Sequence, residues 1–166
     1  MALNIEIRQA RKEDLNEVAE LYADVFNEAS PYEHWTKDSA LALFEYWMER
    51  QPDLFFVAED TGKIIGGVAF NIKPWFDGKR FQDGELFVHK DYRKMSVGTE
   101  LFIVTLEKAI EKYGVTRIEA ITFSQKGFPL NWYEKLGLKK ENSLAVITGD
   151  CKLLLENLKK SRKIIK

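Results

Sequence analysis

The spacing of apolar residues predicts one strand and then two helices at the start of the chain. The segment Ile5 to Ala10 alternates apolar and polar positions, as a half-buried strand does. Apolar positions between Leu15 and Phe26 recur at the spacing of an amphipathic helix. The hydroxyl of Thr36 is positioned to cap a second helix, which we expect to end near Gln51.

A β-hairpin is predicted next. Leu54 to Glu59 and Ile64 to Ile72 are rich in strand-forming residues, and the segment Asp60 to Lys63 between them contains a glycine that tolerates a positive φ. We expect Pro74 to Gly78 to interrupt the pattern and Gly84 to His89 to form the fourth strand. The middle of the chain is therefore predicted to be mainly sheet.

The clearest helix is expected from Val97 to Gly114, where the glycine suits a left-handed C-terminal cap. Its apolar positions share one face: Phe102, Leu106, Ala109, Ile110 and Tyr113. A strand is expected at Arg117 to Phe123, followed by a short helix from Pro129 to Leu136 that Gly137 ends. Two short strands are expected between Leu138 and Thr148.

Asp150 is positioned to cap a last helix, at about residues 151–160, that carries a run of leucines. These are Leu153, Leu154, Leu155 and Leu158. A homodimer contact through these leucines is one possible role of this helix. The basic segment Lys159 to Lys166 is expected to be a solvated end.

Length and composition narrow the class of protein. The chain has 166 residues, of which 45% are hydrophobic and 31% charged, the balance of an ordinary globular protein. One domain over residues 1–166 is the default at this length. The 25 Lys and Arg against 26 Asp and Glu leave a net charge of -1. No overall charge therefore attracts nucleic acid or anionic lipid.

The sequence also bears on location. No stretch approaches the roughly 18 consecutive apolar residues of a membrane-spanning helix. The segment Met1 to Asp14 lacks the apolar run of a signal peptide, and a single cysteine, Cys151, cannot form an internal disulfide. We therefore expect a cytoplasmic protein without a membrane or nucleic-acid partner, and no metal site is indicated.

The segment Leu86 to Thr99 carries the strongest chemical signal: an apolar strand, a basic turn with small residues, and a helix start. N–H groups at a helix start are unpaired and lie at its positive end, so a turn that gathers them can bind a phosphate. Arg93 and Lys94 add positive charge, and Gly98 lets phosphate oxygens approach the main chain. A plain turn with solvated basic side chains is the alternative interpretation.

A second segment, Tyr133-Glu134-Lys135-Leu136-Gly137-Leu138, has a tyrosine one helical turn before a glycine cap. Taken alone, such a tyrosine more often packs its ring and hydrogen-bonds its hydroxyl than performs catalysis.

Together, Arg93-Lys94-Met95-Ser96-Val97-Gly98 and the Tyr133 segment resemble two motifs of the GCN5-related N-acetyltransferases (GNAT). The resemblance runs from Ile5 to about Thr148 and excludes the last helix. It implies an α/β (α+β) fold, a mixed, mostly antiparallel, splayed β-sheet flanked by helices, here with an extra C-terminal helix. Acetyl-CoA would bind between the fourth and fifth strands.

In that family the pattern Q/R-x-x-G-x-G/A holds the CoA pyrophosphate, and here Ser96 replaces one glycine. The family also often has N-x-x-A-x-x-F-Y, where this chain has Lys126 in place of the asparagine and Tyr133 at the tyrosine. Ser96 removes some backbone freedom, although its hydroxyl can donate to a phosphate. The cofactor-binding residues that the resemblance implies are Phe87, Val88, Arg93, Lys94, Met95, Ser96, Val97, Gly98 and Thr99.

The resemblance implies an N-acetyltransferase that uses acetyl-CoA as cosubstrate, with direct attack by a primary amine. Tyr133 would be the general acid, since a phenol with a reference pKa of about 10 lies only about 1.5 units above a thiol. Glu85, at the predicted start of the fourth strand, is the candidate general base. His89 or a water chain is the alternative base, and a surface role for Glu85 is the other interpretation.

The acceptor site is expected from the segments Asn27 to Trp35 and Lys73 to Arg80, which combine aromatic and acidic residues. These residues are Tyr32, Trp35, Trp75, Phe76, Glu28, Glu33 and Asp77. Such a set favours a small cationic acceptor, with packing beneath the loops as the alternative. A non-catalytic acyl-CoA-binding sensor or assembly module of the same fold is the rival function, kept open by Ser96 and Lys126.

Overall fold

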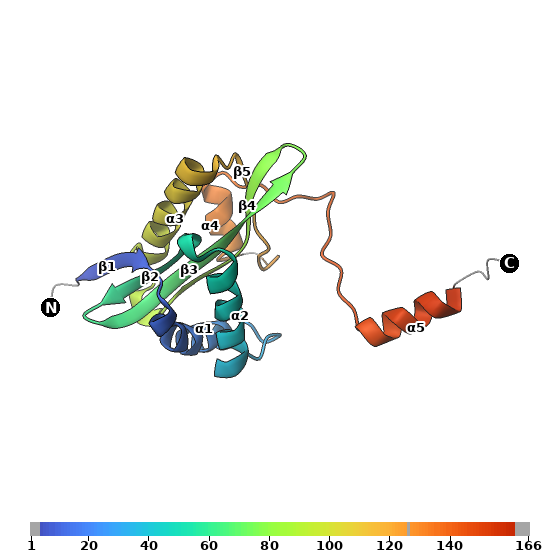
Figure 1. Ribbon diagram of the computed structural model, residues 1–166, viewed down its shortest axis with the longest axis horizontal. Coiled ribbons are helices and arrows are strands. Elements are labelled where there is room, and N and C mark those ends of the chain that lie inside the picture. The colour runs from blue at the N-terminus through green and yellow to red at the C-terminus, as the bar shows by residue number, and fades with distance from the viewer. Residues whose placement is uncertain (1–3, 126, 162–166) are drawn as a thin grey trace. The chain divides into compact units, whose positions relative to one another are not determined.

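The computed structural model describes residues 4–125 and 127–161, except for the side chains of Asp83 and Ser161. The chain divides into two compact units, Met1–Ile121 and Thr122–Lys166. Figure 1 shows the order of their elements from the N-terminus in blue to the C-terminus in red. The single domain expected from the length stays a prediction.

The first unit contains a five-stranded sheet. Its strands are β1 (Ile5–Gln9), β2 (Phe55–Asp60), β3 (Lys63–Trp75), β4 (Gly78–Val88) and β5 (Arg117–Glu119). They lie in the order β1-β2-β3-β4-β5. The first four strands pair antiparallel and β5 pairs parallel with β4. The sheet is thus mixed and mostly antiparallel, as expected.

Helices and short 3-10 turns complete the first unit. They are η1 (Lys12–Asp14), α1 (Leu15–Ala29), α2 (Lys37–Arg50), η2 (Pro52–Leu54), η3 (Lys90–Tyr92) and α3 (Val97–Tyr113). Thr36 caps α2 as predicted, because its hydroxyl accepts a hydrogen bond from the Ser39 N–H at 3.1 Å. Gly114 ends α3 with a φ of 63°, which confirms the predicted left-handed cap.

The helices cover both faces of the sheet, with α1 and α2 on one face and α3 on the other (Figure 1). Two neighbouring glycines of β3 show this, because successive residues of a strand point to opposite faces. A Cβ on Gly66 would lie 3.3 Å from Leu101 of α3. A Cβ on Gly67 would lie 2.6 Å from the ring of Phe87, which packs on the α1–α2 side.

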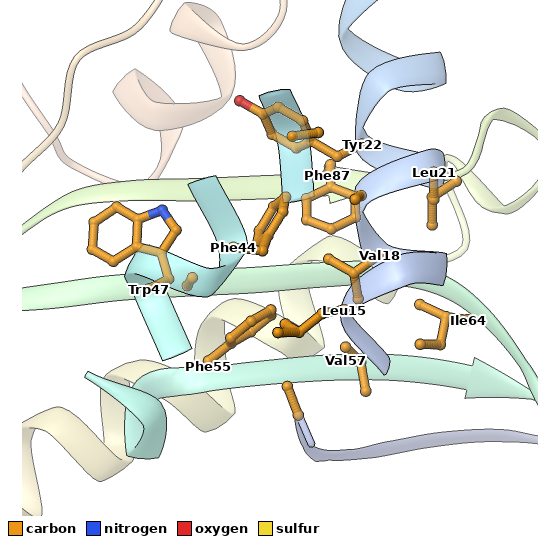
Figure 2. Close-up of a cluster of buried hydrophobic side chains, with 14 of the residues drawn as sticks. Leu15, Val18, Leu21, Tyr22, Phe44, Trp47, Phe55, Val57, Ile64 and Phe87 are labelled. Carbon is orange, nitrogen blue, oxygen red and sulfur yellow. The ribbon is translucent and has the colours of Figure 1, made fainter. Parts of the chain in front are cut away.

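The main hydrophobic core lies between α1, α2 and the sheet (Figure 2). Its buried side chains come from both helices and three strands: Leu15, Val18, Tyr22, Phe44, Phe55, Val57, Ile64 and Phe87. Burying one such large side chain contributes about 1.5–3 kcal/mol. This core fixes the position of α1 over β4, and therefore of any residue that α1 presents to β4.

The prediction for the β3–β4 connection is wrong. The predicted hairpin of β2 and β3 forms, with Thr61 and Gly62 at its turn, but Pro74 to Gly78 does not interrupt the sheet. β3 runs on to Trp75 and β4 begins at Gly78. A proline is tolerated in a strand where no ladder bond is lost, and β2 pairs with β3 only as far as Ala69, so Pro74 lies beyond that ladder.

The second unit contains α4 (Leu130–Lys135) and α5 (Cys151–Ser161). Gly137 follows α4 with a φ of 92°. Asp150 caps α5 as predicted, since its carboxylate accepts a hydrogen bond from the Leu153 N–H at 2.8 Å. None of the helices in the described part of the chain is long and apolar enough to cross a bilayer.

Three other expectations are corrected. Residues 138–148 are described without strands, and the strand expected at Arg117 to Phe123 is limited to β5. Apolar alternation alone does not make a strand, because its main-chain groups need a partner. Ile110 of α3 is 53% exposed and does not belong to the buried face, since that face runs through Leu101, Thr105 and Ala109.

Candidate active site

The edge of β4 that faces β5 is paired along only part of its length. Residues 80–82 pair in parallel with β5, and the ladder stops there because β5 ends at Glu119. β4 continues to Val88 with β3 on its other side. Residues 83–88 therefore have one edge whose main-chain groups β5 does not use. An edge of this kind can bind an extended ligand in the manner of an added strand.

The register of β3 and β4 decides which main-chain groups face that open edge. The His89 N–H donates to the Ile65 carbonyl at 2.8 Å. Hydrogen-bonded pairs alternate along an antiparallel ladder, so the main-chain groups of Phe87 face β3 and those of Leu86 and Val88 face outward. Of the two residues expected at this edge, Val88 faces it. Phe87 does not, which corrects that expectation and brings in Leu86.

The turn between β4 and α3 holds two non-glycine residues in the left-handed conformation. Lys94 has a φ of 67° and Ser96 a φ of 62°, with the exposed Met95 between them. This conformation costs a residue with a Cβ about 1 kcal/mol or more. Ser96 therefore adopts the conformation that suits the glycine of the resembled pattern, and the turn keeps its shape without that glycine.

The N-terminus of α3 supplies main-chain donors. A helix leaves its first N–H groups without partners inside the helix, here those of Val97, Gly98 and Thr99. A Cβ built on Gly98 would meet Val88 Cγ2 at 3.4 Å, an ordinary contact. Packing within the chain therefore does not require a glycine at this position. The positive end of the helix favours an anion there.

Three contacts hold the turn against the rest of the first unit. Arg93 Nη2 lies 3.2 Å from Glu28 Oε2 of α1, and Arg93 Nε donates to the Val88 carbonyl at 3.4 Å. Both side chains of the ion pair are well exposed, so the pair is weak and Arg93 is able to exchange Glu28 for a phosphate. The Tyr92 hydroxyl donates to Asp60 at 2.9 Å, which ties the turn to the end of β2.

Glu85 lies inside β4, because the strand begins at Gly78. Its carboxylate accepts a hydrogen bond from the Tyr22 hydroxyl at 2.8 Å. Burial raises the pKa of Glu85 to about 7, against the hydrogen bond from Tyr22, which lowers it, and with a further rise from the charge of Glu33. A carboxyl group with this pKa can take a proton near neutral pH. The interpretation of Glu85 as an exposed strand end is therefore wrong.

Aromatic side chains hold Tyr22 in position between α2 and β4 (Figure 2). Those that contact its ring, with centroids 4.2–5.4 Å away, are Phe26, Trp35, Phe44 and Phe87. Tyr22 is 1% exposed. Burial first, and then the charge of Glu85, raises the pKa of Tyr22, so its hydroxyl stays protonated as a donor. The donation from Tyr22 to Glu85 was not predicted from the sequence, because the spacing of Tyr22 indicates only another apolar position of α1.

The segment between α1 and α2 lies beside this pair, and its predicted role in selecting the acceptor stays a prediction. The ring of Trp35 meets the ring of Tyr22 edge to face, and Trp35 Nε1 donates to Glu33 Oε2 at 2.7 Å. Tyr32 is 77% exposed. Glu28, expected to take part here, is paired with Arg93 instead.

The hairpin tip from Lys73 to Arg80 does not share these surroundings. Asp77 pairs with Arg80 at 3.3 Å and with Arg117 at 3.0 Å, so its charge is already compensated. Lys73 and Arg80 lie over the ring of Trp75, at 4.9 and 5.0 Å from its centroid. Along β4, Gly78 lies seven positions from Glu85, or about 23 Å, and Arg80 lies five positions from it, or about 17 Å. The part of the hairpin tip in acceptor selection stays a prediction.

His89, the alternative base, lies past the end of β4. Its Nδ1 accepts a hydrogen bond from the Asp91 N–H at 3.3 Å. With Asp24 and Glu28 of α1 it lines an open cavity of about 390 Å³. It is about 13 Å along the strand from Glu85, so the two residues cannot act on one nitrogen from the same place.

Tyr133 belongs to α4 of the second unit. Its N–H donates to the Pro129 carbonyl at 3.2 Å, and its ring is tilted against that of Trp132, with centroids 5.0 Å apart. Its catalytic role stays a prediction. Lys126, the departure from the family's asparagine, lies outside the described residues. Within the residues that are described, no three His, Cys, Asp or Glu side chains are grouped as ligands of a metal ion.

The sequence matches the model of the acetyltransferase (GNAT) family over residues 13–138. An uncharacterized N-acetyltransferase from Methanocaldococcus jannaschii is 30% identical over 139 residues, which are 81% of this chain and 61% of that protein. The chain thus spans about three fifths of this relative. An acetyltransferase from Sodalis glossinidius is 29% identical over 86% of this chain and 93% of its own length.

Solved structures have the same fold. A protein from Pyrococcus horikoshii superposes with a TM-score of 0.69 at 26% identity, over 86% of this chain and 93% of that chain. An aminoglycoside N-acetyltransferase solved with CoA has a TM-score of 0.68 at 19% identity, over 91% of this chain and 98% of that chain. The predicted family and fold class are confirmed, and the names of the relatives agree with the predicted enzyme class.

Proposed function

The chain belongs to the acetyltransferase (GNAT) family, and on that basis we propose that it transfers the acetyl group of acetyl-CoA to a primary amine of a small cationic acceptor. The observation that carries the proposal is Glu85, a part-buried carboxyl with a pKa of about 7 on the strand that has an open edge. A base and an open edge for the acyl donor on one strand suit direct attack by an amine.

The donor is proposed to lie along β4 and end at α3. Outward main-chain groups of Leu86 and Val88 would hydrogen-bond the pantetheine arm, and the N–H groups at the start of α3 would bind the diphosphate. The full set proposed is Leu86, Val88, Arg93, Lys94, Met95, Ser96, Val97, Gly98 and Thr99. The N–H groups at the start of α3 without partners inside the helix and the CoA complex of the aminoglycoside N-acetyltransferase support this binding mode.

Glu85 is proposed to take a proton from the acceptor ammonium, which frees the nitrogen lone pair. The nitrogen then bonds to the acetyl carbon, the carbon–sulfur bond breaks, and the electron pair of that bond leaves on sulfur. Tyr133 is proposed to give its proton to the sulfur. The nitrogen releases its second proton to water and Tyr133 takes one back from water, so the products are a neutral amide and CoA thiol. Support for Tyr133 comes from the resemblance of its segment and from the small cost of proton transfer from a phenol to a thiolate.

Thiol release from acetyl-CoA over a panel of primary amines tests the proposal. At least one amine is expected to give turnover, and Tyr133→Phe is expected to lower kcat about a hundredfold while the Kd for CoA stays the same. Tyr46→Phe removes an exposed hydroxyl from α2 and is the matched control. Unchanged turnover in Tyr133→Phe would remove this residue from the mechanism.

The change in melting temperature on adding CoA distinguishes acetyl transfer from the rival non-catalytic functions. A ligand at a hundred times its Kd adds about 2.7 kcal/mol of stability. A shift without thiol release from any amine would favour the acyl-CoA sensor, and no shift at all would favour the assembly module. The cytoplasmic location and the homodimer stay predictions from the sequence.

A further inference from the structure

The position of Glu33 is fixed by the segment that joins α1 to α2. The side-chain amide of Asn27 donates to the Trp35 carbonyl and accepts from the Trp35 N–H, both at 2.8 Å. This two-bond clamp sets the main chain at Trp35, whose Nε1 donates to Glu33 Oε2 at 2.7 Å. Glu33 is therefore a held carboxylate and not a freely moving side chain of an exposed loop.

Glu33 and Glu85 are joined by two aromatic side chains. The ring of Trp35 contacts the ring of Tyr22, with centroids 5.1 Å apart, and the Tyr22 hydroxyl reaches Glu85. Each carboxylate thus has a neutral aromatic donor on one oxygen. Neither forms an ion pair with a Lys, Arg or His side chain among the described residues. The charge of Glu33 also acts on both Tyr22 and Glu85.

We propose that the acceptor is an aliphatic diamine and that Glu33 binds the ammonium group that does not react. This inference rests on the proposed acetyl transfer. The reacting nitrogen gives one proton to Glu85, bonds to the acetyl carbon as the carbon–sulfur bond breaks, and releases a second proton to water. That end of the acceptor therefore becomes a neutral amide. The other nitrogen keeps its proton and its positive charge, and it needs a counter-ion.

Glu33 supplies that counter-ion at a distance set by the aromatic side chains between it and Glu85. The part-exposed ring of Trp35 offers an apolar surface for the methylene linker and a π face for an ammonium group. A monoamine would leave the charge of Glu33 uncompensated beside Glu85. A diamine satisfies both carboxylates, so its second charge contributes specificity.

The test compares acceptors with the same four-carbon chain, with and without a second positive charge. Diaminobutane, its mono-N-acetyl derivative and butylamine are each offered to the full-length chain, and kcat/KM is measured by thiol release. We expect diaminobutane to exceed both single-charge amines about tenfold, which corresponds to about 1.4 kcal/mol. The measurement is made on the pH plateau so that a change in the ionisation of Glu85 does not contribute.

Glu33→Gln keeps an oxygen that can accept from Trp35 Nε1 but removes the charge. We expect it to lower kcat/KM for diaminobutane about tenfold more than for butylamine. Glu45→Gln removes an exposed charge on α2 and is expected to keep the preference. Far-UV circular dichroism and a thermal melt check that each variant is folded.

Two results would overturn the assignment of Glu33 while leaving acetyl transfer intact. One is equal kcat/KM for diaminobutane and its mono-N-acetyl derivative, and the other is an equal loss for both kinds of amine in Glu33→Gln. An absence of thiol release with every amine would overturn the proposed function itself, and this inference with it.

Discussion

Two carboxyl groups of this protein each accept a hydrogen bond from a tyrosine, yet their pKa values are shifted in opposite directions. Asp53, in η2, accepts from the Tyr113 hydroxyl at 2.7 Å, and Glu85 accepts from the Tyr22 hydroxyl at 2.8 Å. Burial pushes both pKa values up. For Asp53 the hydrogen bonds from Lys112, then Tyr113 and Gln51, outweigh burial and lower the pKa to about 2. The pKa of Glu85 is raised to about 7.

The difference lies in the charge of the third partner. Lys112 Nζ stands 2.9 Å from Asp53, whereas the charged neighbour that acts on Glu85 is another carboxylate, Glu33. A carboxylate with a cation stabilises the fold and has no proton to exchange near neutral pH. A buried carboxyl that has no cation beside it destabilises the fold when it ionises, and it can take up or release a proton near neutral pH. The first kind of site ties η2 to the end of α3, and the second kind suits catalysis.

The largest expected effect concerns turnover. Glu85→Gln should lower kcat/KM for acetyl transfer about a hundredfold at neutral pH, because the amide cannot take the proton of the acceptor. Asp53→Asn, the matched change at the other carboxyl, should keep kcat/KM within about twofold once the variant is shown to be folded. Thiol release measures both. Comparable losses of kcat/KM in the two variants would mean that Glu85 has no special role in catalysis compared with Asp53.

The next effect is on stability. Asp53→Asn should lower the free energy of unfolding by about 1–2 kcal/mol near neutral pH, since it weakens three hydrogen bonds to a charged group. The lowered pKa means that this contribution is present above pH 3.8 and is lost as the pH falls toward about 2. Urea unfolding at several pH values measures it. A deficit that persists unchanged at the lowest pH would contradict the assignment.

A smaller effect of opposite sign is expected at the other carboxyl. Glu85→Gln should raise the free energy of unfolding by about 1 kcal/mol above neutral pH, a figure discounted for solvent access. Because the pKa is raised, the wild-type protein loses stability as the pH rises from 4.5 to about 7, so the variant should gain nothing below 4.5. Urea unfolding over the same pH series measures this difference in the free energy of unfolding. A variant less stable than wild type at high pH would contradict the view that ionised Glu85 is a buried charge without a cation.

The smallest effect sharpens the roles of the two tyrosines. Tyr22→Phe removes the hydrogen bond that lowers the pKa of Glu85, so the acidic limb of the kcat/KM profile should move upward by about one pH unit or less. Tyr113→Phe removes the equivalent bond to Asp53 and should leave the profile where it is. A profile of Tyr22→Phe that coincides with wild type would mean that Glu85 does not govern the limb.

Local signals predicted much of the scaffold. Thr36 predicts the start of α2 because a capping hydroxyl lies within a few residues of the N–H group that it binds. Gly114 predicts the end of α3 because a left-handed cap depends on that one residue. The Thr61–Gly62 turn is as local. The extension of β4 back to Gly78 is local too, because Trp75 pairs with Gly78 across a two-residue connection. It was missed because Pro74 and Gly78 were interpreted as breaks in the strand pattern.

The candidate site divides in the same way. The basic turn with Arg93, Ser96 and Gly98 is contiguous in the chain, so its composition alone pointed to an anion at a helix start. Phe87 was assigned to the open edge and Leu86 overlooked, because a shift of one residue reverses which main-chain groups face outward and only the register settles it. Glu85 was recognised as a carboxyl on the fourth strand, but its burial was not.

The order of most elements, the helix ends, the basic turn that we propose binds phosphate and the identity of the carboxyl on β4 were determined by the sequence, since each depends on residues a few positions apart. The ionisation of that carboxyl was decided by tertiary structure alone. It depends on Tyr22, which is 63 positions away along the chain, and on Glu33 in a separate segment. Desolvation and charge act through space, and folding is what brings these groups within reach of one another.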